Sequence, residues 1–138
     1  TLWMRQLYVL GVKIAIEAIS RIGQRTEAEA DKRNLTIEII RNGSRGLLFL
    51  EPLVEVETAK GRVAYGSVAA KDVASLFDAD FLSGGKHRLG HGLTEEIDYL
   101  KKQERVTFAR CGVIDPLSVD DYVAHGGYAG LKAALAKS

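Results

Sequence analysis

The sequence predicts an α/β sandwich, a mixed sheet covered by helices, followed by a linker and a small α+β tail. Three observations support this prediction. An apolar stretch, an amphipathic stretch and an alternating stretch follow one another as in a β-α-β unit. Two further alternating stretches flank a turn, and a second amphipathic stretch follows them. At 138 residues, of which 46% are hydrophobic, the chain is long enough to bury one core.

The β-α-β unit begins with a short apolar strand at residues 6–10, which ends before Gly11. A helix is expected to run from residue 12 to residue 34, and Gly23 should weaken its middle by ~1 kcal/mol. Residues 35–40 then alternate apolar and polar side chains, as a strand does. A connection of this length predicts that the two strands pair in parallel. The apolar face of the helix consists of Val12, Ala15, Ile16, Ile19 and Ile22.

A hairpin and a second helix come next. Residues 53–58 and 62–66 alternate as strands and are separated by a short turn. Helical spacing of apolar residues resumes near residue 70. β-α-β followed by β-β-α is the order of a thioredoxin-like sandwich, a four-stranded mixed sheet with a helix on each face. Several other α+β topologies share this order of elements.

The composition changes after Leu82. Residues 83–92 are rich in glycine and poor in apolar side chains, which predicts a linker. Ser118 is expected to cap a later helix by accepting a hydrogen bond from the amide of Asp121. We therefore divide the chain into a thioredoxin-like domain, residues 1–82, and a linker with tail, residues 83–138. The tail is expected to contain a short helix, a strand and two helical pieces, at residues 94–100, 105–109, 118–125 and 128–136.

Composition excludes several classes of function. The net charge of +1 gives no electrostatic argument for a nucleic-acid or membrane partner. Cys111 is the single cysteine, so no disulfide or CxxC pair can form within the chain. No apolar run approaches the ~18 residues of a spanning helix, and the start does not resemble a signal peptide. The sequence therefore predicts a cytoplasmic protein.

Two small groups of residues could bind a metal or a phosphate. His87 and His91 have the spacing of a metal pair on a helix, but the surrounding glycines favour a solvated loop. The glycine-rich residues 43–46 follow a strand and could hold a phosphate through their amides. Neither a dinucleotide fingerprint nor a Walker motif is present, so a tight turn is favoured.

Three further candidates also have structural explanations. Cys111 has no base nearby in the sequence and is expected to be a small apolar residue. Glu55 and Glu57 share one face of a strand, which predicts the solvated face of an antiparallel edge. Asp120 and Asp121 suit the start of a helix. The sequence thus assigns no catalytic, cofactor-binding or metal-binding residue.

Residues 108–128, Phe-Ala-Arg-Cys-Gly-Val-Ile-Asp-Pro-Leu-Ser-Val-Asp-Asp-Tyr-Val-Ala-His-Gly-Gly-Tyr, resemble a known family. They are similar to the N-terminal lead-in of the flavin- and NADH-binding subunit shared by respiratory complex I, NAD-reducing hydrogenases and NAD-dependent formate dehydrogenases. Residues 43–56 and 61–66 resemble the thioredoxin-like module fused ahead of that subunit. The combination is most similar to the beta subunits of cytoplasmic, molybdenum-containing, NAD-dependent formate dehydrogenases, from about Leu7 to Leu135.

The resemblance implies where cofactors belong. Relatives hold a [2Fe-2S] cluster with two pairs of cysteines in the thioredoxin-like module. The corresponding positions are filled by Leu10 and Ala15 in the first pair and by Ser44 and Leu48 in the second. We therefore expect this part of the chain to hold no cofactor. FMN, NAD and an iron–sulfur cluster are implied for the part of the polypeptide downstream, and molybdopterin for a partner subunit.

The resemblance also implies a function. We expect a fragment, itself not catalytic, that positions the other subunits of a formate dehydrogenase and the downstream flavin domain of its own chain. The complete complex would oxidise formate to carbon dioxide and reduce NAD. One alternative is the equivalent fragment of an NAD-reducing hydrogenase. An alternative of another class, a thioredoxin-like thiol redox enzyme, is disfavoured because the single cysteine lies beyond the linker.

Overall fold

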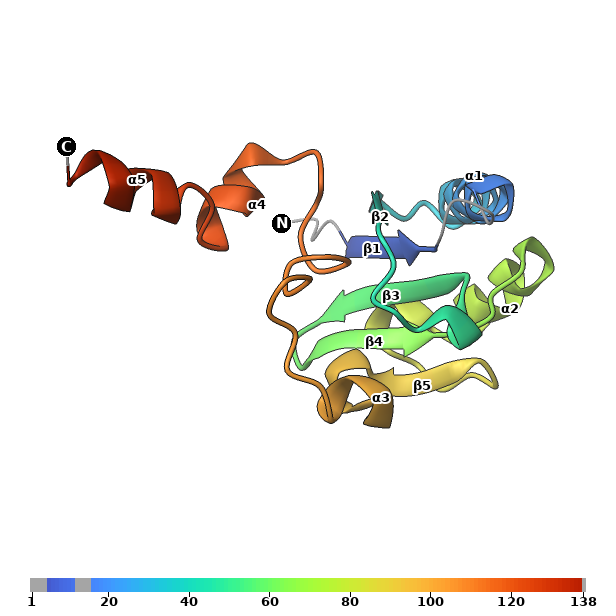
Figure 1. The fold of residues 1–138 in the computed structure, drawn as a ribbon. Helices are drawn as coiled ribbons and strands as arrows, with labels where there is room; N and C mark the ends of the chain where they lie inside the picture. Colours follow the sequence, from blue (N-terminus) through green and yellow to red (C-terminus); the bar gives the residue numbers. More distant parts are fainter. Residues whose placement is uncertain (1–4, 12–15, 138) are drawn as a thin grey trace.

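The centre of the molecule is one mixed sheet of five strands in the order β2-β1-β3-β4-β5 (Figure 1). The structure, a computed structural model, describes residues 5–11 and 16–137. β1 and β2 pair in parallel, and the other neighbouring strands pair antiparallel. The strands are β1 (Arg5–Leu10), β2 (Ile37–Asn42), β3 (Leu53–Thr58), β4 (Gly61–Tyr65) and β5 (Gly90–Leu93). The predicted α/β class is confirmed, with one strand more than expected.

The β-α-β unit and the hairpin form as the sequence predicts. α1 (Ile16–Lys32) connects β1 to β2 and continues through Gly23 without a break. Ile19 and Ile22 lie buried on its inner face, so packing against the sheet outweighs the helix penalty of the glycine. The predicted face positions Val12 and Ala15 lie outside the described residues.

Both helices of the sandwich cover the same face of the sheet, which corrects the prediction of one helix on each face. α2 (Val73–Asp78) lies beside α1, and the Arg33 guanidinium bridges them at 2.6 Å from the Asp78 carboxylate. The same guanidinium stacks over the ring of Phe77. The core between the helices and the sheet includes Leu7, Val9, Ile19, Ile22, Val54, Val56, Tyr65, Val73, Leu76 and Phe77.

Loops and short helical turns cover the other face. The 3-10 turns Leu48–Leu50 and Thr94–Glu96 and the short helix α3 (Asp98–Lys101) pack there. Their apolar side chains form a second core with the strands, made of Tyr8, Leu10, Ile40, Leu47, Leu50, Leu53, Ala64 and Leu100. Since β3 contributes to both cores, it is a central strand with two covered faces.

The segment predicted as a linker contains β5. Gly92 and Leu93 pair with Ala64 and Val63 of β4, and Leu100 further along is buried. Strand pairing uses backbone groups, so a glycine-rich edge strand leaves little trace in side-chain patterns. The predicted strand at residues 105–109 is a series of turns instead, with Val106 and Phe108 exposed. The division of the chain after residue 82 remains a prediction.

Two helices end the chain and project away from the sheet (Figure 1). α4 (Val119–Ala124) begins as predicted, because the Ser118 hydroxyl accepts a hydrogen bond from the Asp121 amide at 3.1 Å. α5 (Ala129–Leu135) follows after Gly126 and Gly127. Neither helix has a buried residue, although both carry large apolar side chains. Within the described ranges, no helix has the length and hydropathy needed to cross a membrane.

Tyr65 ties the glycine-rich segment to the core and makes stability sensitive to alkaline pH. Its buried hydroxyl donates to the Gly85 carbonyl at 2.7 Å. Burial raises the pKa of Tyr65 from 10.0 to about 12. Because the folded-state pKa is the higher one, the stabilisation is complete below the unfolded value and is lost as the pH rises toward the folded one.

Tyr65→Phe is therefore expected to lower the free energy of unfolding at neutral pH by about 1–2 kcal/mol, since it leaves the Gly85 carbonyl unpaired. It should also flatten the fall in stability between about pH 10 and about pH 12, measured by urea unfolding. Tyr128→Phe, at a half-exposed ring, is the control and should keep the wild-type alkaline fall. An unchanged fall in Tyr65→Phe would contradict the assignment.

Glu29 makes stability sensitive to acid. Its carboxylate is 6% exposed and faces Lys32 at 3.0 Å, Arg25 at 3.3 Å and Arg33. Hydrogen bonds from Lys32 and then Arg33 lower the pKa of Glu29. Because the folded-state pKa is the lower one, this stabilisation is present above the ordinary value of 4.5 and is lost as the pH falls through the folded value.

Glu29→Gln is expected to unfold at a lower temperature at neutral pH and to lose less stability than the wild type on acidification below the ordinary glutamate value. Thermal unfolding followed by circular dichroism across the acid range measures both effects. Glu17→Gln, at an exposed i,i+4 pair with Arg21, is the control. If wild type and Glu29→Gln lost stability equally on acidification, this role for Glu29 would be ruled out.

Candidate functional site

The turn after β2 is held together by its own side chains. The Asn42 carboxamide accepts from the Gly43 amide at 2.7 Å, and the Ser44 hydroxyl accepts from the Gly46 amide at 2.9 Å. Ser44 also donates to Glu51. These two amides are thus already used, as in the tight turn that the sequence favoured over a phosphate cradle. Leu48 projects outward and is 61% exposed.

The segment around Cys111 packs onto this turn. The Cys111 thiol donates to the Ser44 carbonyl at 3.3 Å, and the Asn42 amide group donates to the Ile114 carbonyl at 2.7 Å. Gly112 has a positive φ of 76°, and a Cβ atom there would lie 2.4 Å from Cγ of Arg45. Only glycine fits this close approach. The half-buried thiol is therefore a packing group, with a carbonyl as its hydrogen-bond acceptor.

Glu55 lies in a buried charge network, which corrects the prediction of a solvated strand face. Its carboxylate is 0% exposed and accepts from Arg45, itself 3% exposed, at 2.9 Å. Arg45 also pairs with Glu95. Burial by itself lowers the pKa of Arg45, but the charge of Glu55 and the hydrogen bonds to Glu95 and Glu55 outweigh it and raise the pKa overall. The Arg45 guanidinium therefore stays charged inside the fold.

Arg62 joins this network to the tail. Its guanidinium donates to the Gly112 and Val113 carbonyls at 3.2 and 2.7 Å. It also contacts Glu55 at 3.5 Å and Glu57 at 3.0 Å, and it stacks 3.4 Å above the ring of Tyr8. One side chain thus links two sheet strands to the segment that leads into α4. We call these contacts the Arg62 clamp.

The two histidines hold the loop before β5. The Nε2 atom of His87 lies 3.1 Å from the Ser75 hydroxyl, and its Nδ1 accepts from the Leu89 amide at 3.2 Å. Both ring nitrogens of His87 are therefore occupied by contacts within the fold. The His91 ring packs against Gly66. Among residues 5–11 and 16–137, no three His, Cys, Asp or Glu side chains are grouped so that they could hold a metal ion.

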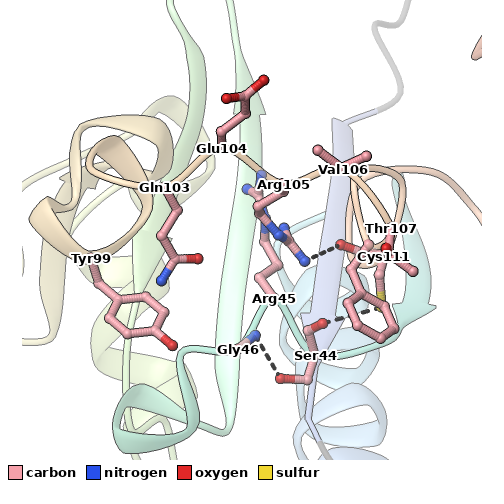
Figure 2. Close-up of a pocket in the computed structure, with 11 residues that line it drawn as sticks. Ser44, Arg45, Gly46, Tyr99, Gln103, Glu104, Arg105, Val106, Thr107 and Cys111 are labelled. Atoms are coloured by element: carbon pink, nitrogen blue, oxygen red, sulfur yellow. Dashed lines mark hydrogen bonds between the residues drawn. The ribbon is translucent and has the colours of Figure 1, made fainter.

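A cavity of about 590 Å³ lies between the turn at residues 44–46 and the tail (Figure 2). Tyr99, residues 103–108 and Cys111 line its tail side. Figure 2 shows Arg105 between Gln103 and Cys111, with one guanidinium nitrogen bonded to the Cys111 carbonyl at 3.3 Å. The sequence did not reveal roles for Arg45, Arg62 or Arg105. Arg45 pairs with Glu95 50 positions away, and Arg62 binds the Val113 carbonyl 51 positions away. The contact of Arg105 depends on the path of the tail.

Comparisons with known proteins support the fold. The wild-type thioredoxin-like [2Fe-2S] ferredoxin of Aquifex aeolicus is 20% identical, with a TM-score of 0.52 over 64% of this chain and 97% of that chain. Its Cys55Ser variant is 22% identical, with a TM-score of 0.51 over 64% of this chain and 99% of that chain. At these identities the likeness shows the thioredoxin-like fold. No protein-family model matches the chain.

A curated relative is the NADP-reducing hydrogenase subunit HndC of Solidesulfovibrio fructosivorans. It is 54% identical over 35 residues, which make up 25% of this chain and 7% of the relative. The chain therefore covers far less than two thirds of that protein. This match favours the hydrogenase alternative over the formate dehydrogenase reading.

The expectation that this part of the chain holds no cofactor is contradicted by the structural neighbours, because they are [2Fe-2S] ferredoxins. A cluster of that kind is held by four cysteine thiolates in the common case. Cys111 is the single cysteine of the chain. At two of the positions that the resemblance assigns to ligands, the Ser44 hydroxyl donates to Glu51 and Leu48 has an exposed hydrocarbon side chain. The side chains described do not match that ligand set, so we derive no electron-transfer step through a cluster.

Proposed function

We propose that this chain is part of the diaphorase-type subunit of an NAD(P)-reducing hydrogenase complex, the subunit that passes electrons to the nicotinamide nucleotide. The observation that supports it best is the 35-residue match to a subunit named as part of an NADP-reducing hydrogenase. The thioredoxin-like fold agrees with the module that the sequence resemblance places ahead of a flavin- and NADH-binding subunit.

Within that complex, the role we propose for this chain is to position its neighbours. The Arg62 clamp fixes the tail to the sheet, and the tail leads into α4 and α5, whose apolar side chains are exposed. A group of exposed apolar side chains on one surface is typical of an interaction site. The partners proposed are a flavin domain downstream in the same polypeptide, which would supply FMN, an iron–sulfur cluster and the NAD(P) site, and the other subunits of the complex.

The test is purification of the natural polypeptide that contains this chain, followed by identification of its stoichiometric partners and assay of hydrogen- and formate-dependent NAD(P) reduction. A hydrogenase catalytic subunit with hydrogen-dependent activity is the expected result. A molybdopterin subunit with formate-dependent activity would overturn the hydrogenase assignment in favour of the formate dehydrogenase alternative. A polypeptide that purifies alone and without either activity would overturn both.

A further inference from the structure

We propose that the cavity between the turn at residues 44–46 and the tail binds an organic carboxylate that carries an aromatic or aliphatic group. Its volume of about 590 Å³ lies within the range of small-molecule sites, about 300–1,000 Å³. The proposal is independent of the function proposed above. It rests on the charge, the polar groups and the apolar walls of the cavity.

Arg105 supplies the charge. Arg105 is half-buried as a residue, and its guanidinium donates to the Cys111 carbonyl and has no acidic partner among the described side chains. The other arginine of the cavity, Arg45, is already paired with Glu55 and Glu95. Glu104 is the acidic residue on the wall, and Figure 2 shows its carboxylate pointing away from Arg105. A guanidinium with free donors matches the two oxygens of a carboxylate.

The neighbouring polar groups can complete the site. Gln103 and the Tyr99 hydroxyl line the cavity on the side of Arg105 away from Cys111 (Figure 2). Neither side-chain polar group has a hydrogen-bond partner within the part of the chain that the structure describes. They can therefore donate to a bound carboxylate or to a second polar group on the same ligand.

The walls fit an apolar body. The Tyr99 ring, the Phe108 ring and Val106 are 44%, 67% and 80% exposed. Outside the lining, Phe49 packs edge-to-face against Tyr99 with a centroid distance of 5.9 Å. The Tyr99 and Phe108 rings, which both line the cavity, would lose contact with water when a ligand with an apolar group fills it.

A carboxylate fits better than a phosphate. A phosphate carries more charge and is commonly bound by several backbone amides or by more than one cation. The Gly43 and Gly46 amides instead donate hydrogen bonds to side-chain oxygens. Among the described residues that line the cavity, Arg105 is the single cation without an acidic partner.

The test is an NMR titration of the ¹⁵N-labelled 138-residue chain with phenylacetate, with phenylacetamide as the uncharged match. Phenylacetate is expected to shift the Arg105 side-chain resonance and the amides of residues 103–108, and to bind at least roughly 10-fold more tightly than phenylacetamide. Arg105→Gln should weaken phenylacetate binding at least roughly 10-fold. Equal affinities for the two probes, or unchanged binding in Arg105→Gln, would overturn the proposal.

Arg110→Gln is the matched control, because it removes the same charge from the same segment. Arg110 stacks on Tyr122 outside the cavity, so this variant should bind phenylacetate as the wild type does. A second arm uses the blocked peptide acetyl-Phe-Asp-amide, in which the aspartate carboxylate is the only one. Tighter binding of the peptide than of phenylacetate supports a carboxylate from a protein segment, and weaker binding supports a free small molecule.

Discussion

Arg45→Met is expected to lower the free energy of unfolding by about 3–5 kcal/mol, the range seen when one partner of a buried ion pair is removed. The substitution leaves the Glu55 carboxylate buried with Arg62 at 3.5 Å as its remaining cation. The methionine keeps most of the apolar stem, so the loss reports mainly on charge. Urea unfolding at neutral pH, followed by circular dichroism, measures it.

The double variant Arg45→Met/Glu55→Leu separates the charge from the packing. It removes both ions, so it should recover most of the stability lost in the single variant. Arg21→Met, at an i,i+4 pair in which both side chains are more than two-thirds exposed, is the control and should change stability by less than about 0.5 kcal/mol. A small loss in Arg45→Met, similar to that of Arg21→Met, would show that Glu55 is not held by this pair.

Arg62→Gln is expected to release the tail from the sheet while the sheet itself stays folded. The variant removes two charge-assisted hydrogen bonds to the Gly112 and Val113 carbonyls. Their loss should lower the local opening free energy by about 3 kcal/mol, which corresponds to roughly 100-fold faster exchange. Amide hydrogen exchange of Cys111, Val113 and Ile114, whose amides are hydrogen-bonded within the tail, measures the effect.

Two variants control for general loss of stability. Arg62→Lys keeps the charge but cannot contact both carbonyls in the same geometry, so it should give an intermediate rate. Arg88→Gln removes an arginine paired with Asp72 on the other side of the fold and should leave tail exchange unchanged. If the tail amides exchange at the wild-type rate in Arg62→Gln, the clamp does not hold the tail.

The elements with regular side-chain periodicity could be predicted. Alternation over residues 53–58 and the turn after it define the β3–β4 hairpin, because both signals lie within a few residues. The inner face of α1 follows from the helical spacing of Ile19 and Ile22. The Ser118 cap also depends on a contact three residues away. Each of these features depends on residues a few positions apart, so the sequence is sufficient to predict it.

Elements defined by distant partners could not be predicted. β5 contains two glycines and pairs through its backbone with β4, so its side chains carry no alternating pattern. Glu55 has the position of a solvent-facing residue in its own strand. It is buried because Arg45, Arg62 and the tail converge on the sheet face that no long helix covers.

The sequence by itself determined the α/β class, the order of the first elements and the turn and cap residues, because these depend on neighbours a few positions apart. The tertiary structure alone decided that both helices share one face, that a glycine-rich segment adds a fifth strand, and that three arginines acquire roles. The physical reason is that a buried charge or an edge strand is stabilised by partners tens of residues away. Their approach depends on how the layers pack.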